Sequence, residues 1–295
     1  MSRHSVIDVG SNTIHLLVGE VDGGEVLPVT GEKVSARLGA GVEKKGRIDA
    51  GRLELAAGAI DLFARISAQS GVPEPVILAT SAVRDAENGP ELTERVRELT
   101  GLKMRLISGE EEAELGFRGA VSAVGTSWEG PSLVVDLGGG SAQLIVGEAS
   151  SAPLMQVSLP LGSNRTTERF VESDPPKKKE LRSLDEHVKE LMPGWGLSQR
   201  VSVVAVGGSA RAMLKITRDD LTVERLRGLA LEISDRPSPV LAREYGLAPE
   251  RARVLPAAIT TLAAILEHFG RDRLTVARGG LREGTLLALA DGEEI

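Results

Sequence analysis

Val134-Val135-Asp136-Leu137-Gly138-Gly139-Gly140-Ser141-Ala142-Gln143-Leu144-Ile145-Val146-Gly147 is the stretch that decides the fold. Two apolar, β-prone runs flank a glycine-rich turn, which predicts a strand, a tight turn and a second strand. Consecutive glycines expose backbone N–H groups with no Cβ in the way, so a phosphate can lie against them. Asp136 ends the first strand, where its carboxylate can hold a divalent cation, and Ser141 adds a hydroxyl donor. Taken alone, the pattern also fits an ordinary β-hairpin.

The same pattern occurs near the N-terminus, at a constant offset of 128 residues. Val6–Glu20 aligns with Val134–Glu148 without a gap, and seven of the fifteen positions are identical, including Asp8 with Asp136. Repetition at a fixed offset indicates repeated architecture. The sequence therefore predicts two similar domains, each opening with a phosphate-binding loop, and two such loops across a cleft would hold one anionic ligand from both sides.

Length and composition fit this organisation. The 295 residues suffice for two domains, and 41% hydrophobic with 26% charged residues are globular values. Aromatic residues make up only 2%, so we expect a core of Leu, Val, Ile and Ala. The absence of cysteine excludes disulfides, thiolate metal sites and a cysteine nucleophile. The four histidines form no His-Glu-x-x-His pattern, which disfavours a His-based metal site.

Charge and hydropathy limit the partners. A net charge of −7 argues against broad nucleic-acid binding. The N-terminus runs directly into the first predicted strand, and no apolar run is long enough to span a bilayer. We expect a cytoplasmic protein with no membrane partner.

A polar cluster follows the buried strand predicted over 75–79, after an amphipathic helix over 50–69 and a long loop over 39–46. Thr80 or Ser81 can cap the next helix. Arg84, placed after the carboxyl end of a strand, can bind phosphate bidentately. An arginine on the surface of that helix is the equally open alternative.

Two further segments place chemistry at helix starts. Glu110, Glu111 and Glu112 lie in the first turn of a helix predicted from about 108 to 123, where carboxylates complement the helix dipole. Three exceed that need, so one can face the cleft and take a proton from an attacking water. Gly207-Gly208-Ser209 follows a strand at 201–206 and opens a helix whose free N–H groups can bind an anion.

Six motifs in one order carry a resemblance to a known family. They are Asp-Val-Gly-Ser-Asn-Thr (8–13), Thr-Ser-Ala-Val-Arg (80–84), Ser-Gly-Glu-Glu-Glu-Ala (108–113), Asp-Leu-Gly-Gly-Gly-Ser (136–141), Val-Gly-Gly-Ser (206–209) and Gly-Gly-Leu-Arg-Glu-Gly (279–284). Together they resemble the exopolyphosphatase / guanosine pentaphosphate phosphohydrolase family of the actin-like ATPase superfamily. The resemblance covers nearly the whole chain, which is similar to the short, two-domain members.

The resemblance implies an α/β fold of two ribonuclease-H-like (actin/hexokinase-type) domains. Each would be a mixed five-stranded sheet flanked by helices, with the active site in the cleft between the domains. We expect residues 1–122 with 284–295 to form the first domain and residues 123–283 the second. The family likeness also suggests a homodimer.

The implied activity is hydrolysis of the terminal phosphoanhydride of inorganic polyphosphate, with Mg²⁺ or Mn²⁺ and a water nucleophile. Such a reaction needs positioning and charge neutralisation more than covalent chemistry. Asp8 and Asp136 would hold the metal, and Glu112 corresponds to the family's catalytic glutamate and is the candidate general base. The predicted phosphate-binding residues are Gly10, Ser11, Asn12, Thr13, Arg84, Gly138, Gly139, Gly140, Ser141, Gly207, Gly208 and Ser209.

One position departs from the family pattern, in which a glutamate follows two residues after the serine of Gly-Gly-Gly-Ser. Here the residue is Gln143, which keeps the shape but cannot usefully accept a proton and is a weaker Mg²⁺ ligand. Three hypotheses follow. Glu112 performs the base chemistry alone in a slower enzyme; the protein binds polyphosphate or a nucleotide without turnover; or the residue is an engineered change that traps the ligand.

Other functions stay open at this point. Hydrolysis of guanosine pentaphosphate is the alternative within the same class, and no feature selects a chain length or a nucleotide. A non-catalytic sensor that binds an anion and closes belongs to another class. A sugar or acetate kinase of the same superfamily would need a substrate pocket that the cluster Glu110–Glu112 does not suggest.

Overall fold

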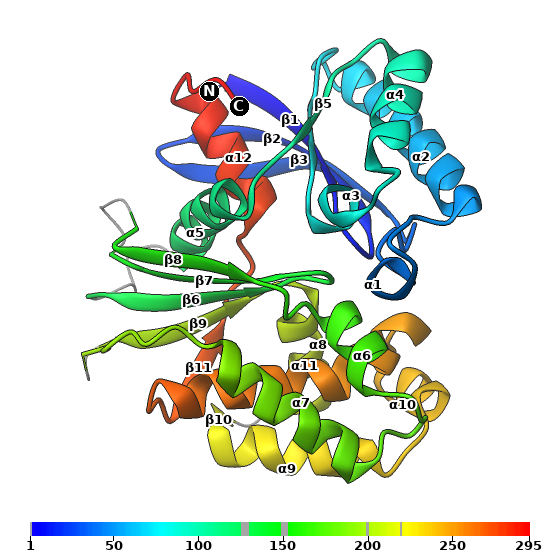
Figure 1. The fold of residues 1–295 in the computed structure, drawn as a ribbon. Coiled ribbons are helices and arrows are strands. Elements are labelled where there is room, and N and C mark those ends of the chain that lie inside the picture. The colour runs from blue at the N-terminus through cyan, green and yellow to red at the C-terminus, as the bar shows by residue number, and fades with distance from the viewer. Residues whose placement is uncertain (1, 125–129, 149–152, 199–200, 219) are drawn as a thin grey trace. The chain divides into compact units, whose positions relative to one another are not determined.

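A computed structural model describes residues 2–124, 130–148, 153–198, 201–218 and 220–295. The chain divides into two compact units, of which the first comprises Met1–Trp128 with Gly279–Ile295 and the second Glu129–Arg278. Each unit is built on one β-sheet (Figure 1). No helix within the described ranges is both long enough and apolar enough to cross a membrane.

The first unit holds a five-stranded mixed sheet in the order β3-β2-β1-β4-β5. β1, β2 and β3 are antiparallel neighbours, whereas β4 and β5 run parallel to β1. Its elements are β1 (Ser2–Val9), β2 (Ile14–Asp22), β3 (Glu25–Val34), α1 (Val42–Lys45), α2 (Ala50–Gln69), β4 (Val76–Ala79), α3 (Ser81–Asp85), α4 (Gly89–Thr100), β5 (Met104–Leu106), α5 (Gly109–Val124) and α12 (Leu281–Ala290).

Alternating side chains of β1 enter two separate cores. Ile7 and Val9 belong to the core built with α2 and α4, whereas Val6 packs with residues of α5 and α12. Because strand side chains alternate between faces, the first sheet is covered on both sides. Asp8 shares the face of Val6 and so lies on the side of α5 and α12.

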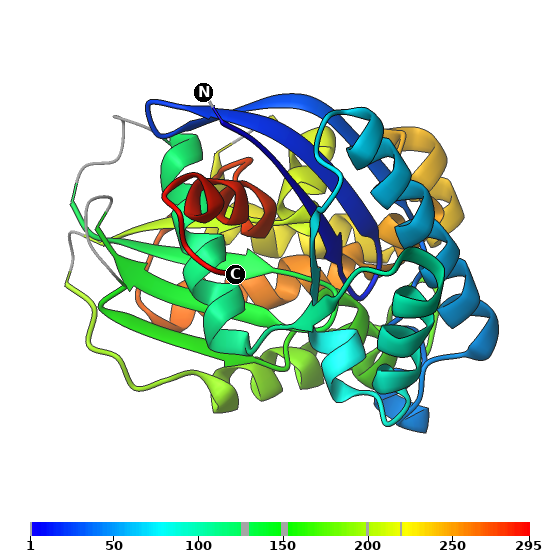
Figure 2. The same ribbon diagram turned by 90° about the horizontal axis from the view of Figure 1, so that it is seen from above.

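Glycines allow α5 and α12 to lie side by side (Figure 2). A Cβ on Gly119 would overlap the carbonyl group of Gly280, and one on Gly284 would overlap the carbonyl group of Leu115. The Gly-Gly-Leu-Arg-Glu-Gly motif at 279–284 therefore serves helix packing within the first unit.

The second unit repeats the strand pattern in the order β10-β11-β9-β6-β7-β8. β6, β7 and β8 are antiparallel, and β9 and β11 run parallel to β6. Its elements are β6 (Ser132–Leu137), β7 (Ala142–Gly147), β8 (Met155–Leu159), α6 (Ser163–Phe170), α7 (Lys178–Leu191), β9 (Ser202–Val206), α8 (Gly208–Ile216), β10 (Leu221–Thr222), α9 (Val223–Ser234), α10 (Ser238–Tyr245), α11 (Pro249–His268) and β11 (Arg273–Val276).

The expectation of five strands is wrong for this second sheet, which has six. The Thr222 side chain accepts a hydrogen bond from the Arg225 N–H and so caps α9, which begins only at Val223. Leu221 and Thr222 therefore stay extended and pair with β11.

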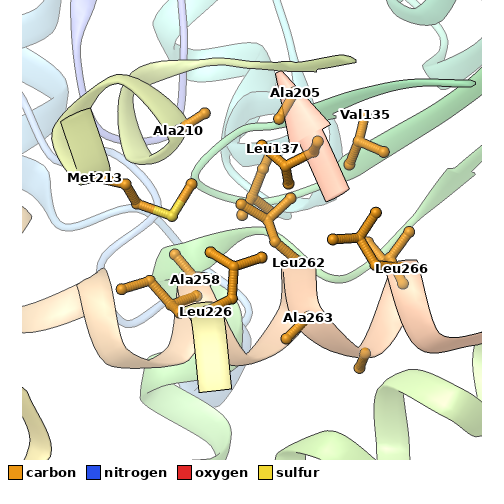
Figure 3. Close-up of a cluster of buried hydrophobic side chains, with 14 of the residues drawn as sticks. Val135, Leu137, Ala205, Ala210, Met213, Leu226, Ala258, Leu262, Ala263 and Leu266 are labelled. Atoms are coloured by element: carbon orange, nitrogen blue, oxygen red, sulfur yellow. The ribbon is translucent and has the colours of Figure 1, made fainter. Parts of the chain in front are cut away.

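The core of the second unit is aliphatic, as the composition predicts. Val135 and Leu137 of β6 meet Leu262 and Leu266 of α11, and Met213 of α8 closes the cluster (Figure 3). The opposite set of β6 side chains includes Asp136 and faces away from this helical layer, because strand side chains alternate.

Two local expectations from the sequence are wrong. The segment 39–46, predicted as a long loop, contains the short helix α1, bounded by Gly41 and Gly46 with φ of 83° and 68°. Thr80 precedes α3 but makes no side-chain cap, and the Ser81 hydroxyl instead lies 3.0 Å from the Ser11 hydroxyl.

Candidate active site

Both predicted phosphate loops close with the same backbone hydrogen bond. In the first loop the Gly10 N–H donates to the Thr13 carbonyl at 3.2 Å, and in the second the Gly138 N–H donates to the Ser141 carbonyl at 3.0 Å. The donor and acceptor atoms of the two hydrogen bonds are therefore also related by the offset of 128 residues.

The second loop has its carbonyl oxygens occupied by the start of α6. The N–H groups of Ser163 and Asn164 donate to the carbonyls of Gly138 and Gly139 at 2.9 and 2.8 Å. Within the described parts of the chain, the N–H groups of Gly139 and Gly140 donate to no backbone carbonyl. A loop with bonded carbonyls and open N–H donors is suited to an anion.

A glycine behind each loop permits this close backbone contact. A Cβ on Gly162 would overlap the carbonyl groups of Gly139 and Gly140. In the first unit the Gly39 N–H donates to the Ser11 carbonyl at 2.8 Å, and a Cβ on Gly39 would come 3.0 Å from the Ser11 Cβ. A glycine therefore packs against the backbone of each loop, and this contact is closer in the second unit.

The glutamates in the first turn of α5 have different surroundings. Glu111 accepts from the Ser108 N–H at 2.8 Å, and the Glu111 N–H donates to the Ser108 hydroxyl at 3.1 Å, which forms a capping box. The backbone hydrogen bond from Ser108, helped by the charge of Arg105, holds the pKa of Glu111 below its ordinary value. Glu110 is exposed. Helix capping and solvent exposure therefore account for two of the three carboxylates.

Glu112 instead forms an ion pair with Arg84. The Arg84 Nη1 lies 3.6 Å from the Glu112 Oε2 and donates to the Ile107 carbonyl at 2.8 Å, while Nε lies 3.8 Å from the Asp85 Oδ1. The side chain of Glu112 is only 12% exposed and that of Arg84 only 26%. The first unit thus brings the predicted base and the predicted phosphate-binding arginine together, and Arg84 is not a solvent-facing helix arginine.

The two predicted metal ligands occupy matching places at the ends of β1 and β6. Asp8 and Asp136 are both half-buried. Gly207, with φ of 99°, leaves room beside the second carboxylate, because a Cβ there would come 3.1 Å from the Asp136 Oδ1 and 2.7 Å from the Leu137 carbonyl oxygen.

This donor set fits one kind of metal binding. Among the described residues no group of three or more His, Asp or Glu side chains gathers as a metal cage. Mg²⁺ is commonly held by one or two carboxylates together with waters and substrate phosphates. A single aspartate beside each phosphate loop is compatible with an Mg²⁺ ion that arrives with its phosphate ligand.

Strand register extends the duplication to a row of side chains across each sheet. Residues directly opposite on antiparallel strands point to the same face. His15 and Gln143, at the centres of the two rows, are related by the offset of 128. The first row is Asp8, His15 and Lys33, and the second row is Asp136, Gln143 and Ser158.

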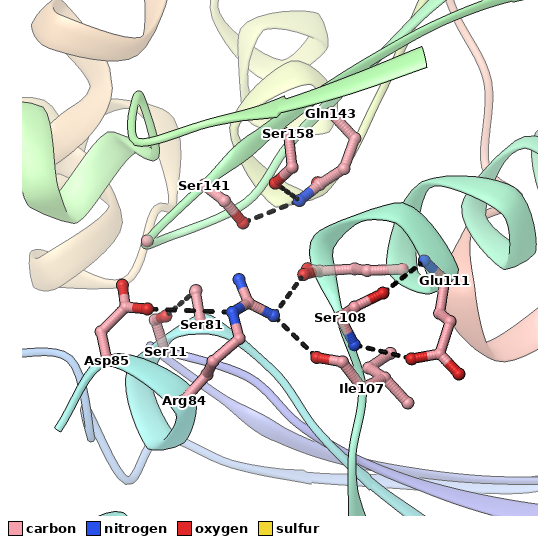
Figure 4. Close-up of polar contacts among 12 residues, drawn as sticks. Ser11, Ser81, Arg84, Asp85, Ile107, Ser108, Glu111, Ser141, Gln143 and Ser158 are labelled. Carbon is pink, nitrogen blue, oxygen red and sulfur yellow. Dashed lines mark hydrogen bonds and ion pairs between the residues drawn. The ribbon is translucent and has the colours of Figure 1, made fainter. Parts of the chain in front are cut away.

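Gln143 links two serines in the second row. Its side chain is buried, and Nε2 donates to the hydroxyl oxygens of Ser141 and Ser158 at 2.8 and 3.1 Å (Figure 4). Within the described residues its Oε1 has no hydrogen-bond partner. The sequence alone does not predict the position of Ser158, because it follows from the register between β7 and β8.

Arg251, at the start of α11, places a cation beside the third glycine turn, Gly207-Gly208-Ser209, and the sequence did not predict this residue. Its Nη1 donates to the Ser209 hydroxyl at 2.7 Å, and a Cβ on Gly208 would come 2.5 Å from its Nη2. Burial lowers the pKa of Arg251 and the charge of Arg211 lowers it further, whereas Glu250 opposes the change. Two cations beside the N-terminus of α8 favour an anion there.

The duplicated sheets and loops define an actin-like ATPase-type fold. The sequence profile of the Ppx/GppA phosphatase family matches residues 17–293, and the chain belongs to this family. Exopolyphosphatase 1 of Mycobacterium tuberculosis is 31% identical over 308 residues, which cover 99% of this chain and 89% of the relative. Exopolyphosphatase 1 of Mycobacterium leprae is 30% identical, with 99% and 90% covered.

Solved structures agree with the family assignment. A Ppx/GppA family member from Aquifex aeolicus superimposes with a TM-score of 0.80 at 25% identity, covering 99% of each chain. An exopolyphosphatase from Cytophaga hutchinsonii gives a TM-score of 0.87 at 24% identity, again with 99% of each chain covered, and supports the fold. The family and the two-domain fold class expected from the sequence are thereby confirmed, while the roles of individual site residues stay predictions.

Proposed function

We propose that this protein is an exopolyphosphatase that releases orthophosphate from the end of inorganic polyphosphate with the help of Mg²⁺. The observation that carries the proposal is the placement of Glu112 against Arg84, while helix capping occupies Glu111. The mycobacterial relatives, both named exopolyphosphatase 1, support polyphosphate as the substrate class.

Glu112 acts as the general base in this proposal. The oxygen of a water attacks the terminal phosphorus while the water proton passes to the Glu112 carboxylate. The bond from that phosphorus to the bridging oxygen breaks, and its electron pair leaves with the shortened chain. Arg84 keeps N–H groups that are not used by Ile107 or Glu112, and these donate to the phosphate oxygens.

Backbone and side-chain donors hold the rest of the polyanion. The N–H groups of Gly10–Thr13 and of Gly138–Ser141 each bind phosphate oxygens, and Arg251 with Ser209 binds a further phosphate at the third glycine turn. Asp8 and Asp136 would hold Mg²⁺, which when bound neutralises phosphate charge. The expected closure of both loops on one ligand, the homodimer and the cytoplasmic location stay predictions.

Gln143 leaves the proton transfer to Glu112, because an amide does not accept a proton usefully. We therefore expect a slow but genuine hydrolase. Measurable orthophosphate release distinguishes such an enzyme from a protein that only binds polyphosphate.

The test is orthophosphate release from long-chain polyphosphate, with guanosine pentaphosphate as the second substrate. We expect release from polyphosphate with Mg²⁺ and none after chelation of the metal. Faster release from the nucleotide would assign the alternative activity. Bound polyphosphate with no release by either the unmodified protein or Gln143→Glu would overturn the hydrolase proposal.

A further inference from the structure

The hydrogen bonds of the second row have a fixed polarity. Gln143 uses both protons of its amide nitrogen, one on the Ser141 hydroxyl oxygen and one on the Ser158 hydroxyl oxygen. The lone pair of an amide nitrogen is delocalised into the carbonyl group, so this nitrogen donates hydrogen bonds and does not accept them. Neither serine can therefore send its own proton to this nitrogen, and both hydroxyl protons must find another acceptor.

The orientation of the amide has a physical reason. Gln143 is only 1% exposed, and its Oε1 has no hydrogen-bond partner among the described residues. Turning the amide over would let Oε1 accept from the serines but would leave two buried N–H groups unpaired. Buried N–H groups without a partner are rarer than under-satisfied carbonyls, so the observed orientation is the favoured one.

We propose that Gln143 and Ser158 are positioning residues that commit the Ser141 hydroxyl as a donor toward an anion on the Gly138–Ser141 loop. This arrangement lets the loop bind a phosphate chain even without Mg²⁺. The identity of the anion rests on the proposed function, whereas the polarity rests on the hydrogen bonds alone.

A glutamate at position 143 would have the opposite effect. A carboxylate only accepts, so the protons of Ser141 and Ser158 would turn toward it and Ser141 would present lone pairs to a phosphate. The new charge would also lie directly across from Asp136, where like charges repel each other. A cation would then be needed before the loop could bind a polyanion.

The test is calorimetric binding of tripolyphosphate to the full chain in a metal chelator. We expect Ser141→Ala to weaken binding by on the order of tenfold, the loss of one charge-assisted hydrogen bond, and Ser158→Ala to weaken it by less, because Ser158 contacts only the Gln143 amide. Because Ser158 acts on the anion only through Gln143 and Ser141, the double variant should bind no more weakly than Ser141→Ala alone. Ser158→Thr keeps the hydroxyl on a strand and should bind like the unmodified protein.

Gln143→Glu is the sharpest variant. We expect it to weaken binding without Mg²⁺ by at least about tenfold, and we expect added Mg²⁺ to restore the affinity. Additive losses in the serine double variant, tight metal-free binding by Gln143→Glu, or no metal-free binding by the unmodified protein would each overturn the inference.

A parallel assay of orthophosphate release separates this inference from the proposed function. The expected binding pattern without any release would refute the hydrolase and leave the role of Gln143 and Ser158 intact. Release from polyphosphate together with additive serine losses would leave the hydrolase intact and remove the positioning role.

Discussion

The two hairpins share a backbone but differ in the side chains that cross their sheets. Both loops close with the same hydrogen bond, from Gly10 to Thr13 and from Gly138 to Ser141. All three side chains of the first row can carry charge, whereas in the second row only the aspartate can. In the proposed function both loops bind phosphate, the first unit supplies Glu112 as the proton acceptor, and the second row adds neutral donors beside its loop.

The strongest way to break this comparison is to remove the proton acceptor of the first unit. We expect Glu112→Gln to lower kcat for orthophosphate release by roughly 10²- to 10⁴-fold, the usual contribution of a general base. Glu110→Gln, an exposed position in the same helical turn, is the matched control and should keep its rate. An undiminished rate in Glu112→Gln would exclude Glu112 as the base.

The glycines behind the two loops, Gly162 and Gly39, should differ in how much an alanine at each position destabilises the protein. Gly162→Ala would drive a Cβ into two backbone carbonyls, which cannot move aside, so we expect a loss of about 3 kcal/mol in unfolding free energy. At Gly39 the nearest atom is the Ser11 Cβ at 3.0 Å, and Gly39→Ala should cost about 1 kcal/mol. Urea denaturation measures both losses, and equal losses would contradict the tighter support of the second loop.

One carboxylate of the second unit should make the stability of the protein depend on pH. In the second unit Arg227 and Lys189 hold Glu267, and the hydrogen bonds from Arg227 are the main cause that lowers its pKa from 4.5 to about 2. A carboxyl whose pKa is depressed by folding stabilises the protein above its unfolded pKa, and this stabilisation is lost as the pH falls from about 4.5 to about 2.

The variant Glu267→Gln measures this contribution. After allowance for solvent screening we expect it to destabilise the protein by about 1 kcal/mol at neutral pH. The difference from the unmodified protein should close as the pH approaches 2 in thermal or urea unfolding. A difference that does not depend on pH would show that the lost contribution is packing rather than charge.

The smallest effect is expected at an exposed ion pair of the first unit. Glu94 pairs with Arg97 on the surface of α4, and both side chains are more than half exposed. Such exposed pairs contribute little, so Glu94→Gln should leave the midpoint of urea unfolding within experimental error of the unmodified protein. A loss as large as that of Glu267→Gln would remove the difference between the two kinds of ion pair.

Local patterns in the sequence predicted most of the fold. The helix over 50–69 and the duplicated hairpins follow from apolar periodicity and from glycine positions that act within a few residues. The sixth strand was missed because it depends on a single cap at Thr222. Ser158 and Arg251 were missed because their partners lie 15 and 42 residues away, where strand register and helix packing decide the contact. The sequence likewise could not decide whether Arg84 and Glu112 lie close together, because their contact depends on the packing of α3 against the start of α5.

The most direct test of the proposed separation between proton transfer and anion binding measures tripolyphosphate affinity and orthophosphate release on the same sample of Glu112→Gln. The loops and the second row are intact in this variant, so we predict unchanged affinity together with the large loss of release given above. A loss of affinity in step with release, or the retention of both, would contradict the assignment of proton transfer to Glu112 and of anion binding to the phosphate loops.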